Sequence, residues 1–180
     1  IKNIPLHLPE SVTVEVRGEV YMKRSVFAAI NKARLEEGDE PFANPRNAAS
    51  GTLKQKDSAE VSRRNLSFVA YQGFGGAIKH QHQSGMLANL RFLGFETTND
   101  LAHGVTLIPA LTTVQRRVEV IAEEIRARAS VRDSLDLDVD GLVFKIRDIA
   151  TQEDLGVGTK SPNWAVAFKF PPEKKSTVLK

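Results

Sequence analysis

The chain has 180 residues, with 25 lysines and arginines against 22 aspartates and glutamates, a formal net charge of +3 and no cysteine. This length suits one domain with a sizeable core. The lack of cysteine excludes disulfides, a thiol nucleophile and cysteine-ligated metal centres from these residues, and it fits a cytoplasmic protein. No apolar run approaches the roughly 20 residues of a membrane span. Because the chain starts at Ile1 rather than Met, we expect a piece of a longer protein.

The first elements follow from simple patterns. Valines alternate with polar residues from Val12, which predicts a half-buried strand running to Tyr21. A helix is expected from Val26 to about Glu37, with Ser25 as its N-cap and Gly38 ending it.

The later elements alternate irregularly between extended and helical patterns. We expect a small-residue helix start at 47–53, a strand at 66–72, a short helix capped by Ser84 and closed by Gly94, a long helix at 113–129, and extended runs at 135–146 and 164–170. This order favours an α+β fold, with mainly antiparallel sheets and flanking helices, over a doubly wound parallel sheet.

Two lysines stand inside apolar strands. Lys145 lies in Leu-Val-Phe-Lys-Ile, and Lys169 lies in Trp-Ala-Val-Ala-Phe-Lys-Phe. In the second run, alternation places Lys169 with Ala165 and Ala167, opposite the large apolar side chains. A single lysine of this kind usually extends to solvent. Two in separate strands favour a site for an anion such as phosphate.

The segment Asn44-Pro-Arg-Asn47, followed by small residues, is typical of a helix start that allows close approach of a ligand. Exposed N–H groups there would attract phosphate, and Arg46 would add a bidentate donor. A capped helix with a surface arginine explains the segment equally well.

Two apparent metal motifs are weak. Asp136-x-Asp138-x-Asp140-Gly resembles half of a calcium-binding loop, but the position that needs a bidentate glutamate is Arg147. We therefore reject a calcium site. His80 and His82 have no third ligand nearby in the sequence, so we expect them to be surface residues.

Read together, these segments resemble the adenylation (nucleotidyltransferase, ATP-grasp-like) domain of bacterial NAD-dependent DNA ligases, over essentially the whole chain. The phrases that carry the resemblance are Glu15-Val-Arg-Gly-Glu19, Phe42-Ala-Asn-Pro-Arg-Asn-Ala-Ala-Ser-Gly51, Asp140-Gly-Leu-Val-Phe-Lys145 and Ser161-Pro-Asn-Trp-Ala-Val-Ala-Phe-Lys-Phe-Pro171. On this resemblance, residues 1–180 are a partial adenylation domain.

The resemblance implies the reaction of such ligases. A lysine attacks the α-phosphorus of NAD, nicotinamide mononucleotide leaves, and AMP passes from the lysine to the 5′-phosphate of nicked duplex DNA. The 3′-hydroxyl then displaces AMP and seals the strand, with magnesium assisting. The implied partners are NAD or AMP, nicked DNA and the remaining ligase domains in cis, with no membrane. The implied location is the bacterial cytoplasm, associated with the nucleoid.

The resemblance also implies roles for particular residues. Glu19 would hold the adenylate ribose, and the Tyr71 ring would cover the adenine, although by default these are a solvated carboxylate and a core aromatic. Lys145 and Lys169 would be supporting catalytic cations near the adenylate phosphate. The remaining assignments are Arg46 and Lys54 at DNA phosphates and Asp140 as a metal-binding or orienting carboxylate.

The chain also departs from the family pattern. The family's nucleophile lies in a Lys-x-Asp-Gly motif, and these 180 residues contain none. We therefore expect the isolated chain not to adenylylate itself. Lys54 and Asn163 stand where arginine is usual, which would weaken DNA contacts. Zinc would belong only to a four-cysteine module elsewhere in the parent protein. The alternative is a non-catalytic nucleotide- or nucleic-acid-binding module of the same fold.

Overall fold

The computed structural model describes residues 1–9, 11–76, 78, 80–101, 105–110 and 113–171. Its elements, in chain order, are β1 (Glu15–Tyr21), α1 (Arg24–Glu36), α2 (Pro45–Leu53), α3 (Ser58–Arg63), β2 (Ser67–Phe74), α4 (Gln83–Phe92), α5 (Val114–Val131), the 3-10 turn η1 (Arg132–Ser134), β3 (Gly141–Lys145), α6 (Ile149–Leu155) and β4 (Ala165–Lys169). The fold is α+β, as the sequence predicts.

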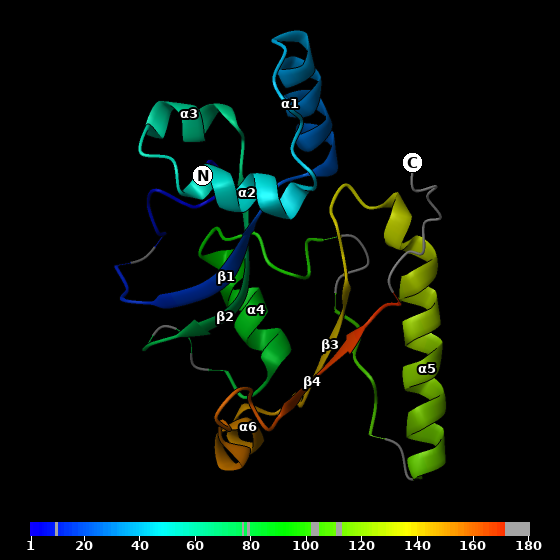
Figure 1. Cartoon of the computed structure of the whole chain (residues 1–180). Coiled ribbons are helices and arrows are strands. Elements are labelled where there is room, and N and C mark those ends of the chain that lie inside the picture. Colours follow the sequence, from blue (N-terminus) through cyan, green and yellow to red (C-terminus); the bar gives the residue numbers. More distant parts are fainter. Residues whose placement is uncertain (10, 77, 79, 102–104, 111–112, 172–180) are drawn as a thin grey trace.

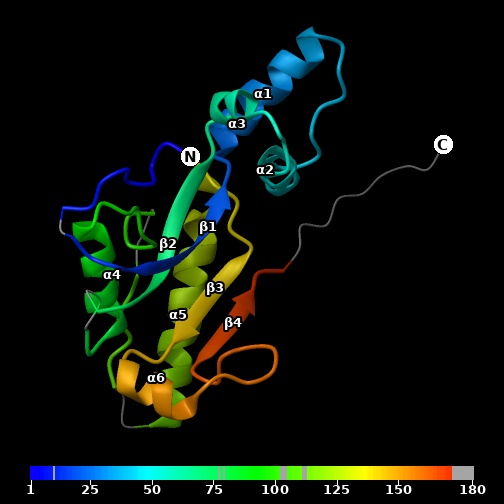
Figure 2. The same ribbon diagram turned by 90° about the vertical axis from the view of Figure 1, so that its left-hand side faces the viewer.

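The strands form two separate antiparallel sheets. β1 pairs with β2, and β3 pairs with β4. In Figures 1 and 2, α4 lies against the β1–β2 sheet, while α5 runs beside the β3–β4 sheet on its far side from β1 and β2. The two sheets are therefore neighbours in the middle of the molecule, with helices outside them.

Two small apolar cores hold the first sheet. One lies where α1, α2 and α3 meet the end of the sheet, and its buried members are Met22, Ala48, Ala49 and Leu66. The other lies between the sheet and α4, and its buried members are Ala70, Met86, Leu87 and Leu90. Because α4 covers one face of the β1–β2 sheet, polar side chains can occupy only its other face.

Several predicted boundaries need correction. Ser25 is not the N-cap of α1, since that helix starts at Arg24 and Lys23 stands at its cap position. Ser25 instead donates its hydroxyl to the Asp136 carboxylate at 2.6 Å. Likewise, His82 rather than Ser84 precedes α4. Gly38 follows α1 with a φ of 82°, a left-handed conformation that glycine adopts readily.

The run expected to be extended from 135 to 146 is a strand only at Gly141–Lys145. Its first residues bind the start of α1 instead: besides the bond to Ser25, Asp138 accepts from Arg24 at 2.6 Å. The bond from Ser25 holds the pKa of Asp136 below its usual range. These carboxylates therefore have structural partners, which agrees with the rejection of a calcium loop.

The long helix is confirmed, with the Thr113 side chain accepting from Arg116 N at its start. Of the described elements, α3 and α6 are helices that the sequence analysis did not predict. No helix in the described part of the chain combines the length and apolarity that a membrane span requires.

Candidate functional site

A β-bulge places Tyr71 in the first sheet. Arg17 pairs with Gln72 and Gly18 pairs with Ala70, so Tyr71 is the extra residue on β2. A Cβ at Gly18 would lie 2.2 Å from Cζ of Phe68 and 2.3 Å from the carbonyl oxygen of residue 69. The aromatic ring thus fills the space above Gly18, and only glycine fits beside the bulge. Bulges commonly redirect a side chain in this way.

Glu19 and Tyr71 share the open face of this sheet. Glu19 pairs directly with Val69, which places it on the face opposite Ala70. Alternation does not fix the side of Tyr71, because it is the bulged residue, but its ring is exposed and is not part of the core against α4. Both side chains are exposed, whereas Ala70 points the other way into the core against α4. The sequence therefore brings a carboxylate and an aromatic ring to one surface.

Lys145, at the end of β3, reaches this surface from the second sheet. Its Nζ lies 5.5 Å from the centre of the Tyr71 ring and 5.8 Å from that of Trp164. Among the described residues, no carboxylate forms an ion pair with it. Burial lowers the pKa of Lys145, because the charged ammonium is partly removed from water. The cation is thus held by two aromatic rings rather than by an anion.

Lys169 and Asp140 form the charged end of the second sheet. Nζ of Lys169 lies 2.5 Å from Oδ2 of Asp140, and both side chains are largely exposed. This hydrogen bond holds the pKa of Asp140 below its usual range, and the positive charge of Arg46 adds a smaller effect. Arg46, from α2, is therefore close enough to act on this pair.

The register of the second sheet relates the two lysines. Gly141 pairs with Lys169 and Lys145 pairs with Ala165, so both lysines lie on one face, at opposite ends of the sheet. Four residues of strand separate the two positions by about 13 Å. Val143 and Ala167 lie between them on this face. The lysines therefore line the same surface without meeting at one point.

Helix α2 carries the two predicted DNA-contacting residues. Asn44 caps it by accepting from Asn47 N, and Pro45 is its first residue, as the sequence predicts. Arg46 is exposed at its start and Lys54 is exposed at its end. Eight residues of helix separate these positions by about 12 Å along the axis. The buried side of α2 consists of Pro45, Ala48, Ala49 and Thr52, which leaves the Arg46 and Lys54 side chains outside the core.

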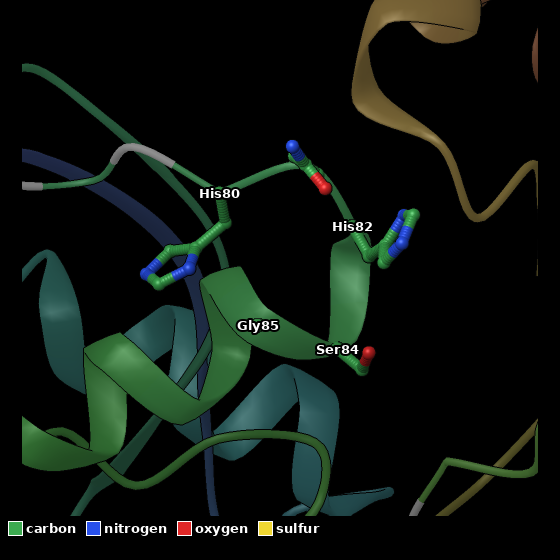
Figure 3. A pocket seen from close by; sticks show the side chains of 5 residues that line it. His80, His82, Ser84 and Gly85 are labelled. Atoms are coloured by element: carbon green, nitrogen blue, oxygen red, sulfur yellow. The ribbon is translucent and has the colours of Figure 1, made fainter.

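His80 and His82 border a surface hollow of about 470 Å³, and none of the residues predicted to bind nucleotide or DNA lines it. Figure 3 shows their rings pointing to different sides of the loop. Nε2 of His80 lies 2.8 Å from Nδ2 of Asn89, and Nδ1 of His82 lies 3.8 Å from a carboxylate oxygen of Asp148. No cluster of three His, Asp or Glu side chains suited to a metal occurs among the described residues.

Sequence reasoning missed the indole of Trp164 as a partner of Lys145, since it placed Trp164 only among the apolar residues of its strand. It also missed Gln83 and Gln152, which are buried. The signal available for the tryptophan was its place one residue before β4, at the sheet end that carries Lys145. No sequence signal marked the glutamines, because their roles depend on contacts between distant segments.

The fold and this surface together define an α+β domain in which two small antiparallel sheets present a carboxylate, two aromatic rings and two lysines. The chain matches the family described as NAD-dependent DNA ligase adenylation domain over residues 1–173. It belongs to this family, which implies NAD and DNA as ligands and places the chain in nick sealing during DNA replication and repair.

Proposed function

We propose that this chain forms most of the adenylate pocket of an NAD-dependent DNA ligase and that the nucleophilic lysine comes from a segment outside residues 1–180. The observation that carries the proposal is the contact of Lys145 with Tyr71 across the two sheets. It brings together an aromatic ring, a cation and, on the same face as the ring, the Glu19 carboxylate.

In the proposed pocket, the adenylate lies along the face shared by the two lysines. Its base stacks on Tyr71 beside Lys145, and Glu19 accepts hydrogen bonds from ribose hydroxyls. Its phosphate lies toward Lys169. The resemblance implied that both lysines approach the phosphate. Their places at opposite ends of the sheet favour Lys169 for that role and Lys145 for the base.

The chain's contribution to catalysis is electrostatic. NAD, when bound, supplies the adenylate group that is transferred. Lys169 neutralises charge on the phosphate, and Asp140 holds the Lys169 ammonium in place at 2.5 Å. Lys145 fixes the base, so that the phosphate is presented in one orientation. The attacking amine is supplied by a Lys-x-Asp-Gly segment that these residues do not contain.

The described residues do not provide a resident magnesium site. The Asp140 carboxylate is already paired with Lys169 and lies near Arg46, and cations at this distance oppose binding of another cation. We therefore assign Asp140 the orienting role and derive no step through a metal held by this chain. Any zinc would be held by other parts of the ligase.

Arg46 and Lys54 are proposed to contact phosphates of the nicked duplex. They are exposed at the two ends of α2, and cations there can bind the DNA backbone without disturbing the core. Lys54 offers a point charge where an arginine would offer a bidentate pair of donors, so its contact is the weaker one.

We place the parent ligase in the cytoplasm, where bacterial DNA is sealed.

The test uses the product of the complete gene and a duplex carrying one 5′-phosphorylated nick. We expect NAD-dependent and not ATP-dependent sealing, and we expect Lys169→Ala to lower it by at least about 100-fold. Lys160→Ala, an exposed lysine in the loop before β4, is the matched control. Absence of NAD-dependent sealing by the wild-type product would favour the alternative, a non-catalytic nucleotide-binding module, and sealing unchanged by Lys169→Ala would contradict the role proposed for Lys169.

A second measurement addresses the nucleophile. The isolated chain is incubated with NAD and magnesium, and its intact mass is recorded. We expect no added adenylate. A stable adduct would contradict the proposal that the nucleophile lies outside these residues.

A further inference from the structure

Two buried glutamines connect the strands that carry Tyr71 and Lys145. Gln83 is the first residue of α4 and Gln152 lies in α6, and they are only 8% and 5% exposed. Nε2 of Gln152 donates to Oε1 of Gln83 at 3.2 Å. Buried amides of this kind are stable only when they are hydrogen-bonded.

Each glutamine also holds a backbone carbonyl at the proposed pocket. Nε2 of Gln83 donates to the carbonyl oxygen of Tyr71 at 3.3 Å, and Nε2 of Gln152 donates to that of Ile146 at 2.5 Å. Ile146 directly follows Lys145. The series from the Tyr71 carbonyl through the two amides to the Ile146 carbonyl, here called the glutamine relay, therefore connects β2 with the residue that follows β3.

Backbone bonds lie beside the glutamine relay. Gln83 N donates to the carbonyl oxygen of Arg147 at 2.8 Å, and Ile149 N donates to that of Gln81 at 2.9 Å. These bonds attach the loop before α4 to the turn after β3. They fix the two segments to each other, but they do not touch β2. Among the hydrogen bonds of the described residues, that from the Gln83 side chain to the Tyr71 carbonyl links this joint to the strand that carries Tyr71.

We propose that Gln83 and Gln152 are positioning residues that set the separation of Tyr71 and Lys145, and hence the surface on which the adenine base is proposed to stack. The inference rests on the proposed function for the identity of the ligand. The positioning itself does not depend on it. A loosened relay would let water reach Lys145 and let Tyr71 and Lys145 move independently.

The test replaces each glutamine with methionine, which is similar in length and cannot donate. The first readout needs no ligand: the amine-labelling rate of Lys145 relative to Lys160 in the same molecule, measured by peptide mass spectrometry. We expect this ratio to rise severalfold in Gln83→Met and Gln152→Met, because Lys145 becomes accessible. The second readout is AMP affinity from Trp164 fluorescence, expected to fall by about tenfold.

The double variant separates a relay from two independent contacts. Because the glutamines act as one unit, the double variant should bind AMP no more weakly than the weaker single variant. Thr52→Val is the stability control. Thr52 is completely buried and donates to the carbonyl oxygen of Ala48, in a helix that does not touch the relay. It should lower stability while leaving the labelling ratio unchanged. If Gln152→Met does not fold, the labelling ratio and AMP affinity of Gln83→Met alone test the positioning role, since this variant keeps the hydrogen bond from Gln152 to Ile146.

The outcomes distinguish the two proposals. Relay variants that lose stability but keep the wild-type labelling ratio and AMP affinity would overturn the positioning role. A wild-type chain that binds no AMP would contradict the proposed pocket. The labelling ratio alone would then test whether the glutamine relay positions Lys145. Increased labelling with unchanged AMP affinity would support positioning and contradict the placement of the base at Tyr71 and Lys145.

Discussion

The Lys145 ammonium lies 5.5 Å from the centre of the Tyr71 ring, and this contact joins two sheets that share no strand pairing. Among the described residues, the lysine has no carboxylate partner, and burial lowers its pKa. A partly buried, unpaired ammonium costs stability. We therefore propose that the cation is kept for a ligand.

The first prediction concerns Lys145→Met. Because this change removes a partly buried charge and keeps the apolar stem, the free energy of unfolding should stay the same or rise by about 1 kcal/mol at pH 7. AMP binding should be lost. Urea denaturation measures the first effect. A clear loss of stability would contradict a lysine held for binding rather than for folding.

Wild type and Lys145→Met should also differ in how the free energy of unfolding depends on pH. The pKa of Lys145 is lowered in the folded state, so between that value and the usual lysine value the unfolded chain binds more protons. Wild-type stability should therefore rise with pH in this window relative to Lys145→Met. The difference between the two proteins should narrow from pH 7 to pH 10. A constant difference would contradict the lowered pKa.

The second prediction concerns Tyr21. Burial, with a smaller effect from the nearby Glu96 carboxylate, raises the pKa of Tyr21 to about 12. The stability that depends on the neutral phenol is present below its unfolded pKa of about 10 and is lost as pH rises toward 12. Wild type should thus lose stability relative to Tyr21→Phe across this range, as urea denaturation can measure.

Absorbance gives a direct check of the same value. The chain has two tyrosines, so Tyr71→Phe leaves Tyr21 as the only one. The phenolate absorbance of this variant should titrate near pH 12. A midpoint near the ordinary tyrosine value would contradict the account.

The third prediction compares two glycines. A Cβ at Gly18 would overlap the Phe68 ring and a backbone carbonyl, whereas a Cβ at Gly51, in α2, meets nothing within 4 Å. Gly18→Ala should destabilise the chain by at least about 2 kcal/mol. Gly51→Ala should stabilise it by up to about 1 kcal/mol through helix propensity. Equal effects in urea denaturation would contradict the close packing at the bulge.

The fourth prediction concerns Lys169 and Asp140. The hydrogen bond from Lys169 lowers the pKa of Asp140, so its stabilising effect is present above the usual carboxyl pKa and is lost as pH falls through the lowered value. Lys169→Met should raise the pKa of Asp140 toward its usual range. Carboxyl NMR titration measures this, with Lys160→Met as the control. An unchanged Asp140 titration would show that the pair does not form in solution.

The sequence predicted much of the fold because its signals were local. The capped start of α2 at Asn44, the start of α5 near Thr113, the antiparallel pairing class and the placement of Lys169 on one strand face with Ala165 and Ala167 all follow from patterns within a few residues. The missed helix α3 also had such a signal in Asp57, whose side chain caps it.

Other features could not be read locally. Ser25 looked like a helix cap, but its hydroxyl binds Asp136, 111 residues away. The bulge at Tyr71 depends on the pairing register of two distant strands. The relay between Gln83 and Gln152 joins residues 69 positions apart. In each case, a tertiary partner decides what the side chain does.

The most direct test of the pocket is an AMP titration followed by the fluorescence of Trp164, the single tryptophan of the chain, whose ring lies 5.8 Å from Nζ of Lys145. Wild type and Lys160→Met should show the same saturable change in emission, and Lys145→Met and Tyr71→Leu should show none. Equal binding by all four proteins, or no binding by wild type, would contradict an adenylate site at Tyr71 and Lys145.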